Sequence, residues 1–478
     1  MNFGIIGYIV GVVMTIEGAA MLLPWIVSLI YGESSGISFL VCAIISGAIG
    51  LLITRRKPKN TAFFAREGFV MVSLSWIVIS LIGAIPFVVS GEIPNVVDAL
   101  FEIVSGFTTT GSSILTDVES LSKCMLFWRS FSHWIGGMGV LVFILAILPM
   151  AGGQNIYLMK AESTGPSVGK LVPKVQKTAF WLYGIYTAMT LMQLVLLLIG
   201  KVPVFDAFCL AFGTAGTGGF GVLGDSFVSY SAFAQNATIV FMLLFGVNFN
   251  FYFFILSRRY KNALAMEDVR WYFIIYIISS AIITINLIFS GMFNGLREVL
   301  FQTSSVMTST GFASADFNLW PSLSRALMIM LMFVGACGGS TGGGMKVTRY
   351  VIYAKTVAKE IRQLAHPRSV KILKMDGKPI EHEVIRIVNV YLCTFILVFA
   401  ASLIIILTDN FDLTTSFTAV AATLNNIGPG LNMVGPTGSF AEFSMLSKVV
   451  FIFDMLAGRL EIFPMIMILL PSTWRKAG

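Results

Sequence analysis

Ten apolar stretches, most of them about 20 residues long, recur along this chain of 478 residues and limit the folds open to it. Each is long enough to cross the roughly 30 Å hydrocarbon core of a bilayer as a helix. Backbone that is not helical survives at that depth only where protein or water covers it. We predict spans at residues 3–31, 37–54, 68–90, 125–150, 178–200, 231–257, 271–291, 321–345, 384–408 and 440–471. The eighth and tenth stretches are candidates for broken helices.

Composition places the chain among membrane proteins. Apolar residues make up 56 % of it and charged residues only 12 %, with a mean hydropathy of +0.85. Water-soluble proteins carry roughly twice that charged fraction. The first apolar stretch begins at residue 3 without a basic segment, and no small-residue cleavage site precedes residue 31. This pattern predicts a retained membrane helix and not a cleaved secretion signal.

The cysteines give no sign of a zinc site or a disulfide framework. No Cys-x-x-Cys spacing occurs, and such sites need clustered or regularly spaced cysteines. The five are scattered, mostly within apolar stretches: Cys42, Cys124, Cys209, Cys337 and Cys393. We therefore expect them to be small, buried, apolar side chains.

Basic residues gather in alternate loops, which predicts the orientation of the chain. Of the 32 Lys and Arg residues, 25 lie in loops on one side of the predicted spans or at the C-terminus. They are Arg55, Arg56, Lys57, Lys59, Arg66, Lys160, Lys170, Lys174, Lys177, Arg258, Arg259, Lys261, Arg270, the ten from Lys346 to Arg386, Arg475 and Lys476. The positive-inside rule makes this side, and both termini, cytoplasmic. The net charge of +8 then needs no nucleic-acid partner.

A short, partly apolar stretch that ends in a small polar turn with a glycine occurs four times. The stretches begin at Asp98, Asp206, Glu298 and Thr415. In each of them a glycine follows 13 residues later, and these are Gly111, Gly219, Gly311 and Gly428. Their spacings of 108, 92 and 117 residues are too long for a solenoid. Because each copy lies between two predicted spans, the chain carries four helix–short stretch–helix repeats.

The four stretches are too short to cross the membrane. They cover residues 97–107, 205–215, 297–307 and 414–424. At 1.5 Å per residue, a helix of about 11 residues reaches only about half of the bilayer, so it must enter and turn back. All four turns fall on the side opposite the basic loops. Because uncovered turns are not tolerated at this depth, we expect them to cover one another around a shared axis.

Acidic residues begin two of these short helices, at Asp98 and Asp206. An acid at the mouth of a pore attracts cations. An aspartate at a helix start also accepts hydrogen bonds from the free amides of the first turn. We favour this N-cap role for both residues and keep cation attraction as the alternative.

The turns carry the chemistry of a cation site. Glycine adopts positive φ at little steric cost, which allows successive carbonyls to point to one side. Rings of such carbonyls replace the hydration shell of an alkali cation. The short helices end at the turns, so their negative dipole ends face the space beneath. The hydroxyls of Thr108–Thr110 and Thr308–Thr310 either bond within the loop or face the ion.

In these turns the chain resembles the TrkH/TrkG members of the Trk/Ktr/HKT superfamily of potassium transporters, and it does so across nearly its full length. The resemblance implies an all-α polytopic membrane fold. Four M1–P–M2 repeats (helix, pore loop, helix) would surround one central pore, with two extra N-terminal helices at residues 1–66. The repeats would occupy residues 67–160, 161–262, 263–360 and 361–478.

The resemblance also implies a selectivity filter with one glycine per repeat, and all four positions are glycine here. In repeat two Gly218 competes with Gly219, although the 13-residue offset and the following Phe220 favour Gly219. The implied filter residues are Thr109, Thr110, Gly111, Ser112, Gly218, Gly219, Phe220, Thr310, Gly311, Phe312, Ile427, Gly428 and Pro429. K⁺ would bind the backbone carbonyls of Thr110, Gly111, Gly218, Gly219, Thr310, Gly311, Ile427 and Gly428. Plant relatives with serine in the first turn favour Na⁺, so the glycine implies a preference for K⁺.

Two further matches concern the gate. The segment Gly335–Lys346 resembles the family's intramembrane loop, which breaks the second helix of repeat three. The implied gate residues there are Gly338, Gly339, Ser340, Thr341, Gly342, Gly343 and Gly344. Five glycines within these seven residues destabilise a helix by about 1 kcal/mol each relative to alanine. Arg459 resembles the family's pore arginine, and we favour a barrier role for it over simple pairing with Glu461 or Asp454.

The resemblance extends to partners. It implies a homodimer in the cytoplasmic (inner) membrane, with a cytoplasmic TrkA-type ring that binds nucleotides and controls the gate. The expected docking faces for this ring are the basic segments 160–177 and 346–386. K⁺ in the filter is the only ligand implied for this chain, with no organic cofactor.

Three enzyme-like patterns lack the context they need, so we do not expect an enzyme. Gly338–Gly342 matches the Gly-x-Ser-x-Gly elbow, which needs a strand–turn–helix setting and a histidine partner. Gly339–Gly344 has phosphate-loop spacing, but Met345 stands where that motif requires lysine. Gly213–Gly219 lacks the βαβ setting of a dinucleotide fold. We expect His133 to be a hydrogen-bonded packing residue and not a proton relay.

Two functions therefore stay open. One is K⁺ uptake through a channel-like pore down the electrochemical gradient, and the other is a symporter that couples K⁺ to H⁺ or Na⁺. Coupled transporters usually carry intramembrane acids on discontinuous helices, and inverted repeats. Here the repeats run parallel and acids are sparse in the spans, which favours the channel.

Overall fold

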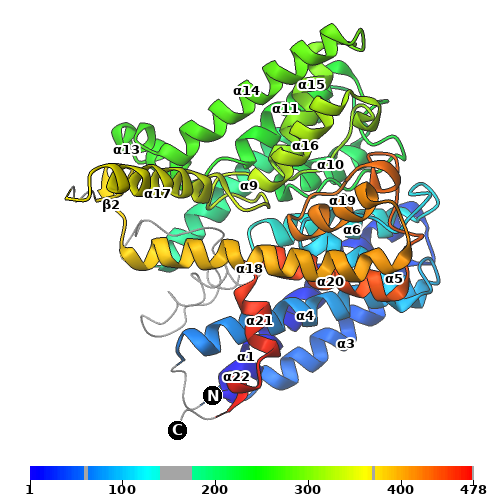
Figure 1. Cartoon of the computed structure of the whole chain (residues 1–478). Helices are drawn as coiled ribbons and strands as arrows, with labels where there is room; N and C mark the ends of the chain where they lie inside the picture. The colour runs from blue at the N-terminus through cyan, green and yellow to red at the C-terminus, as the bar shows by residue number, and fades with distance from the viewer. Residues whose placement is uncertain (59–62, 140–174, 369–371, 476–478) are drawn as a thin grey trace.

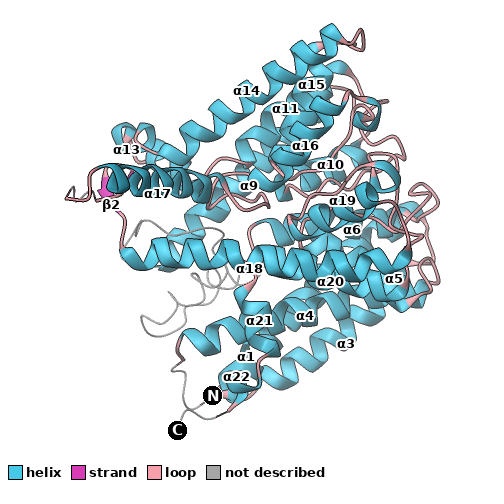
Figure 2. Cartoon of the chain, viewed as in Figure 1, coloured by secondary structure: helices cyan, strands magenta, loops and turns pink. Residues whose placement is uncertain are grey.

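The computed structural model describes residues 1–58, 63–139, 175–368 and 372–475. Within these residues the regular secondary structure is almost entirely helical, and loops join the helices (Figures 1 and 2). Its one sheet there is a small antiparallel hairpin of β1 (Lys374–Met375) and β2 (Lys378–Pro379). In Figure 1 this hairpin lies at the left of the molecule, and the short helices of the four repeats lie towards the right.

Long apolar helices form the frame. They are α1 (Phe3–Ala20), α2 (Leu22–Tyr31), α3 (Gly36–Thr54), α4 (Ala65–Ser90), α9 (Val175–Ile199), α14 (Glu267–Phe289) and α18 (His382–Ile406). By length and composition, six helical segments of the described residues can cross a membrane, with α1 and α2 counted as one. A seventh is the bent pair of α11 (Ala232–Phe245) and α12 (Phe249–Leu256).

The four predicted short helices are present, each within one residue of its predicted ends. They are α5 (Val96–Phe107), α10 (Val204–Gly216), α15 (Leu296–Met307) and α19 (Leu413–Leu424). A long helix precedes each one. The helices that follow them are α6 (Lys123–Gly137), α11, α16 (Ser322–Val334) and α20 (Met445–Arg459). The helix–short helix–helix order is therefore confirmed in every repeat.

The second helices of repeats two, three and four are broken, which corrects the predicted continuous span at residues 231–257. The expected breaks occur after α16, which a loop joins to α17 (Val347–Ala365), and after α20, which is followed by α21 (Phe463–Leu469). The 89° bend between α11 and α12 was not predicted. The second half of the predicted span 125–150 lies outside the described residues, as do Lys59, Lys160, Lys170 and Lys174.

Proline explains the break after α20. Pro464 has no N–H to donate to the carbonyl of Leu460, and in a continuous helix its ring would collide with that carbonyl. The chain therefore restarts a helix at α21, with Pro464 in the first turn. Shorter segments complete the fold: α13 (Tyr260–Leu264), α22 (Pro471–Trp474), η1 (Phe317–Leu319), η2 (Leu407–Asp409) and η3 (Asn432–Val434).

The N-cap predictions for the two acids are wrong. Asn95 caps α5 by accepting from the N–H groups of Val97 and Asp98, and Pro203 precedes α10. Asp98 instead pairs with Lys448 of α20 at 2.7 Å. Asp206 accepts a hydrogen bond from the hydroxyl of Tyr230 at 2.9 Å. Both acids still lie in the first turn of their helices, where the dipole favours negative charge.

The cysteine prediction holds for four of the five residues. Cys42, Cys124, Cys209 and Cys337 are buried, and all five are free thiols. Cys393 is exposed on α18. The expectation of burial is therefore wrong at that one position, where an apolar helix faces outwards.

Candidate ion-conduction site

The four short helices end in the same backbone turn. The residue two positions before each key glycine has φ between 53° and 59°, and these are Thr109, Thr217, Ser309 and Asn426. The N–H of the next residue bonds to the carbonyl five positions back, at 2.8–2.9 Å in all four repeats. A left-handed residue with this bond is the Schellman ending of a helix. The repeat seen in the sequence is thus also a repeat in backbone geometry.

Glycine dihedrals identify the equivalent positions. Gly111, Gly219 and Gly311 have φ of 79°, 78° and 84°. Gly218 has no positive φ, so Gly219 is the geometric equivalent in repeat two. Gly428 also lacks a positive φ. The proline that follows Gly428 favours extended backbone there, and this makes the fourth turn irregular.

The turns contact one another in a closed ring. A Cβ built on Gly111 would overlap the carbonyl oxygen of Gly218, and one built on Gly219 would overlap that of Thr310. A Cβ on Gly311 would lie 2.9 Å from the N atom of Gly428. A Cβ on Gly428 would lie 3.0 Å from the carbonyl oxygen of Gly111, which closes the ring. The predicted mutual covering of the four turns is confirmed, and a side chain at Gly111 or Gly219 would force the backbone apart.

Hydroxyl groups stabilise the turns from within. Thr108 and Thr110 share a hydrogen bond of 2.8 Å between their Oγ1 atoms. The matching pair in repeat three, Thr308 and Thr310, shares one of 2.7 Å. Between repeats, the amide of Asn426 donates to Oγ1 of Thr110 at 2.9 Å. Bonding within the loop, the first of the two roles considered, is therefore observed for Thr108, Thr110, Thr308 and Thr310, whereas the buried Thr109 hydroxyl has no hydrogen-bond partner among the described residues.

His133 of α6 links the first two turns. Its Nε2 accepts from the N–H of Phe220 at 3.3 Å, so Nδ1 carries the proton and donates to the carbonyl of Gly106 at 2.7 Å. The ring is buried and packs on Phe220, with 4.3 Å between ring centroids. The prediction of a hydrogen-bonded packing residue is confirmed.

A buried ion pair, which the sequence analysis missed, supports the first turn. Arg129 of α6 and Glu102 of α5 lie 2.7 Å apart and are both buried. Glu102 also accepts from the N–H of Ile114 and the hydroxyl of Ser113, both just after the turn. The guanidinium of Arg129 lies 4.1 Å from the centre of the Phe220 ring. The only sequence signal was the presence of two opposite charges in apolar stretches on either side of one turn.

The loop between α16 and α17, residues 335–346, contacts two of the turns. We call it the intramembrane loop. The N–H of Gly343 donates to Oγ of Ser309, and the N–H of Gly344 donates to the carbonyl of Asn425 at 2.9 Å. Of the predicted gate residues, Gly343 and Gly344 thus lie against the helix ends of repeats three and four. Glycine is required at Gly343, because a Cβ there would overlap the Asn425 carbonyl.

The first half of the same loop is fastened to the bend of repeat two. The N–H of Cys337 bonds to the carbonyl of Gly246 at 3.1 Å, and the N–H of Phe249 bonds to that of Gly339 at 3.0 Å. Oγ1 of Thr341 donates to the carbonyl of Phe245 at 3.2 Å. The unpredicted 89° bend therefore supplies the backbone groups that hold this half of the loop.

Arg459, at the end of α20, binds backbone carbonyls of two other repeats. Its guanidinium donates to Thr341 in the intramembrane loop at 2.8 Å, and to Gly136 and Gly137 at the end of α6 at 2.5 and 2.7 Å. The C-terminal end of a helix carries partial negative charge, so α6 stabilises this cation. Asp454, one of the two predicted alternative partners, accepts from the hydroxyl of Ser402.

Further charged residues at the end of the intramembrane loop were not predicted. Lys346 donates to the carbonyl of Gly342, and Arg349 donates to that of Met345 at 2.9 Å. Arg349 also forms an ion pair with Glu461 and lies 3.7 Å from the centre of the Tyr391 ring. The sequence signal was weak, because these residues begin a basic segment that membrane orientation alone accounts for.

Charged groups outside the spans fix two more contacts. Hydrogen bonds from the Thr415 hydroxyl, from its N–H and from Asn432 hold the pKa of Asp412, the N-cap of α19, below its usual range. The cap is therefore retained at mildly acidic pH and is lost only as the pH falls through that lowered value. In the β1–β2 hairpin, burial raises the pKa of Asp376, which accepts from the N–H of Glu267 at 2.8 Å.

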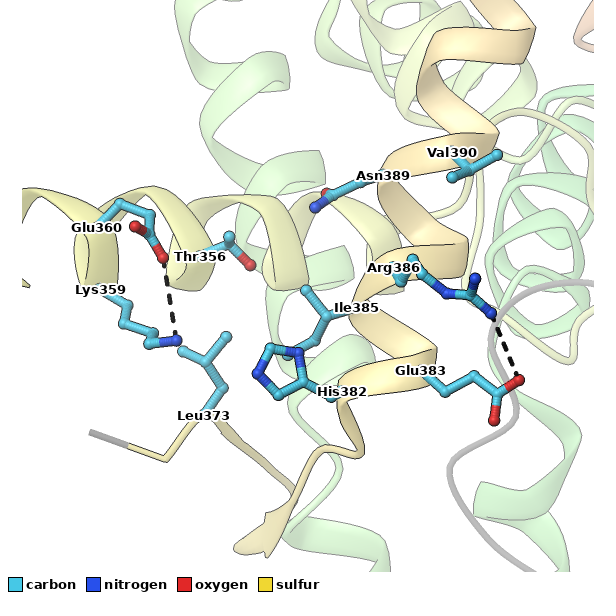
Figure 3. A pocket seen from close by; sticks show the side chains of 10 residues that line it. All are labelled: Thr356, Lys359, Glu360, Leu373, His382, Glu383, Ile385, Arg386, Asn389 and Val390. Atoms are coloured by element: carbon cyan, nitrogen blue, oxygen red, sulfur yellow. Dashed lines mark ion pairs between the residues drawn. The ribbon is translucent and has the colours of Figure 1, made fainter. Parts of the chain in front are cut away.

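A cleft of about 760 Å³ lies between α17 and α18, away from the ring of turns (Figure 3). Lys359 and Glu360 of α17 and His382, Glu383 and Arg386 of α18 are among the residues that line it, and in Figure 3 Glu383 and Arg386 extend away from the α17 residues. The ion pairs on its walls are loose, at 3.9 Å for Lys359–Glu360 and 3.8 Å for Arg386–Glu383. Apart from Asn389 and Val390, the residues that line the cleft belong to the basic segment 346–386, which the resemblance implies as a docking face.

Comparison with known proteins places this geometry in a family. The chain matches the TrkH family model, described as cation transport protein, over residues 35–475. It is 34 % identical to the Trk system potassium uptake protein TrkH of Salmonella typhimurium, with 100 % of both chains covered. It is 30 % identical to the Trk system potassium uptake protein TrkG of Escherichia coli, with 99 % of both covered.

The fold also matches that of a solved structure. The crystal structure of the potassium transporter TrkH from Vibrio parahaemolyticus aligns with a TM-score of 0.89 and 32 % identity, covering 99 % of this chain and 100 % of that one. The predicted all-α polytopic fold is thereby confirmed, and its class is that of integral membrane transport proteins. The chain belongs to the TrkH family of cation transport proteins.

Removal of one partner from the buried pair tests the support of the first turn. In Glu102→Gln, the charge of Arg129 stays buried without its counterion, which costs about 3–5 kcal/mol. We expect a clearly lower thermal unfolding temperature in detergent. The matched control is Glu383→Gln, whose ion pair with Arg386 is exposed and worth less than about 1 kcal/mol. Equal unfolding temperatures for the two variants would contradict this role.

Proposed function

We propose that this protein takes up K⁺ through a channel-like pore whose selectivity filter is the ring of Gly111, Gly219, Gly311 and Gly428. The closed ring of turn-to-turn contacts is the observation that carries the proposal. Four helix C-termini end at the ring, so partial negative charge gathers on its inner side. Carbonyl oxygens in such rings replace the hydration shell of a dehydrated cation.

The choice of K⁺ rests on the relatives. Three proteins that align over nearly the whole chain are named as potassium transporters or potassium uptake proteins. All four ring positions are glycine, which fits the K⁺-preferring members of the superfamily that this sequence resembles. K⁺ itself would be held by the carbonyls of Thr110, Gly218, Thr310 and Ile427 together with those of the four glycines.

We further propose that the arrangement described here is the closed state of a gate. The intramembrane loop lies against turns three and four, and Arg459 joins the loop to the end of α6. A fixed positive charge next to a cation pathway opposes cation passage. Opening would require the loop and Arg459 to separate from these carbonyls.

Regulation and assembly complete the proposal. We place the protein in the cytoplasmic membrane as a homodimer with both termini inside, because the described basic loops favour that side. A cytoplasmic TrkA-type ring would act on the gate through the segment 346–386, where the cleft between α17 and α18 offers loosely paired charges. The other expected docking face, residues 160–177, falls almost wholly outside the described residues.

An ion-coupled symporter is the second candidate, and buried acids favour it. Glu17 of α1 is buried, and neither of its carboxylate oxygens has a hydrogen-bond partner among the described residues. Asp454 of α20 is also buried, and one of its carboxylate oxygens has no hydrogen-bond partner among the described residues. Acids within membrane spans often carry protons in coupled transporters.

The first test concerns selectivity. Gly111→Ser places a side chain at a residue with φ of 79°, where a Cβ overlaps the Gly218 carbonyl. In proteoliposomes we expect K⁺ flux to fall and the K⁺-to-Na⁺ flux ratio to drop by about tenfold, the effect of roughly 1.4 kcal/mol. Gly184→Ser is the control, because nothing lies within 4 Å of a Cβ there. An unchanged ratio in Gly111→Ser would remove Gly111 from the filter.

The second test separates the two candidates. K⁺ flux is measured in proteoliposomes with an imposed pH or Na⁺ gradient at constant membrane potential. The channel predicts a flux that neither gradient changes. A symporter predicts K⁺ accumulation driven by one of the gradients, and Glu17→Gln and Asp454→Asn then identify the acid that carries the proton.

The third test concerns the gate. Arg459→Gln weakens hydrogen bonds that, with a charged donor, are worth about 1.5–3 kcal/mol each. We therefore expect resting K⁺ flux to rise by about tenfold or more, with the K⁺-to-Na⁺ ratio retained. Arg258→Gln, in an exposed loop, is the control for loss of a positive charge. A resting flux equal to that of the parent would argue against a barrier at Arg459.

A further inference from the structure

Directly after Arg459 the backbone makes a strained turn. Glu461 and Ile462 both have positive φ, of 61° and 63°. Ile462 has a ψ of −52°, and the N–H of Phe463 bonds to the carbonyl of Glu461 at 2.7 Å. These dihedrals and this hydrogen bond define the rare, strained γ-turn whose central residue has positive φ.

Isoleucine is an unusual residue at the centre of such a turn. Among the described non-glycine residues with positive φ, Ile462 is the only one with an aliphatic side chain. A β-branched residue in this region is a true outlier, and its strain persists only where the surroundings impose it. Here the side chain is fully buried, and the N–H bonds to the carbonyl of Ala457 at 2.7 Å. Pro464 prevents relaxation into a continuous helix.

The turn brings two charged side chains to the same loop. In a continuous helix, residues two positions apart point about 200° away from each other. Here Arg459 donates to the Thr341 carbonyl in the intramembrane loop. Glu461 pairs with Arg349, which itself donates to the Met345 carbonyl at the end of that loop. One short segment therefore holds the loop at two points, one directly and one through Arg349.

The far end of the intramembrane loop is strained as well. Lys346, the residue before α17, has φ of 74° and ψ of 133°, outside the regions that side-chain-bearing residues normally occupy. Backbone strain gathers at clamps and switches, where it is part of the mechanism. The two strained residues therefore lie in segments that contact each other: Ile462 follows α20, and Lys346 ends the intramembrane loop.

We propose that Ile462 is a positioning residue of the gate. The strained turn centred on it sets the hold of Arg459 and Glu461 on the intramembrane loop. It also raises the free energy of the held arrangement, so that less work is needed to release the loop. This inference rests on the proposed function, in which release of the loop opens a K⁺ pathway. Without the strain the loop would be held in the same place but more tightly.

A pair of substitutions separates the effect of backbone strain at position 462 from the effect of losing the side chain. Ile462→Ala and Ile462→Gly both remove the buried side chain, but only glycine accepts positive φ without strain. In proteoliposomes of the full-length protein, we expect the resting K⁺ flux of the glycine variant to be roughly 5- to 30-fold below that of the alanine variant. Equal fluxes, or a higher flux with glycine, would overturn the inference.

Two further measurements distinguish positioning from a general packing role. In a background that carries both Arg459→Gln and Glu461→Gln, both contacts of this segment with the intramembrane loop are removed. The flux difference between glycine and alanine should then disappear, and its persistence would count against the proposal. The glycine variant should also unfold at a higher temperature than the alanine variant, the reverse of the usual order. If Ile462→Ala does not fold, Ile462→Asn takes its place in a comparison of the same sign, because asparagine accepts positive φ less readily than glycine. A parent protein without K⁺ flux would refute the proposed function and not this turn.

Discussion

Backbone groups that must be satisfied at membrane depth are the constraint on which the whole structure depends. By length, the four short helices reach only about half-way across a bilayer, and at that depth the backbone groups of their turns need protein partners or covering water. The chain solves this by letting the turns cover one another, so that a Cβ position on each glycine faces the next repeat. The same close approach that satisfies the fold places carbonyl oxygens together, and the proposed filter is thus a consequence of how the repeats pack.

The contacts of the intramembrane loop also satisfy backbone groups that helix breaks leave without partners. The broken second helices of repeats two, three and four expose backbone groups, and these bond to one another across repeats. Carbonyls of Phe245 and Gly246 hold the first half of the intramembrane loop, Asn425 holds the second half, and Arg459 joins the loop to α6. A glycine-rich loop is suited to this place because, at Gly343, even a Cβ would collide with the Asn425 carbonyl. The proposed gate is therefore held by backbone hydrogen bonds between the helix breaks, together with a few charged side chains.

Local patterns predicted much of this, and long-range pairing explains the rest. The short helices were predicted to within one residue because apolar length and glycine position are local signals. The choice of Gly219 over Gly218 also followed from spacing. Asp98 was misjudged because its partner, Lys448, lies 350 positions away. The Arg129–Glu102 and Arg349–Glu461 pairs were missed for the same reason, since a single sequence does not say which charges meet. The only sign of the strained turn at Ile462 in the sequence is Pro464, which shows that a helix cannot continue there.

The proposed uptake of K⁺ depends above all on a cation site formed by the four glycine turns. Crystals of the protein grown with Rb⁺ or Tl⁺ in place of K⁺ test it most directly, because the anomalous signal of either ion locates it without reference to flux. We predict an anomalous peak on the axis of the ring, among the carbonyls of Gly111, Gly219, Gly311 and Gly428. Anomalous peaks confined to other sites, with none inside the ring at saturating ion concentration, would show that the four turns do not form a cation site.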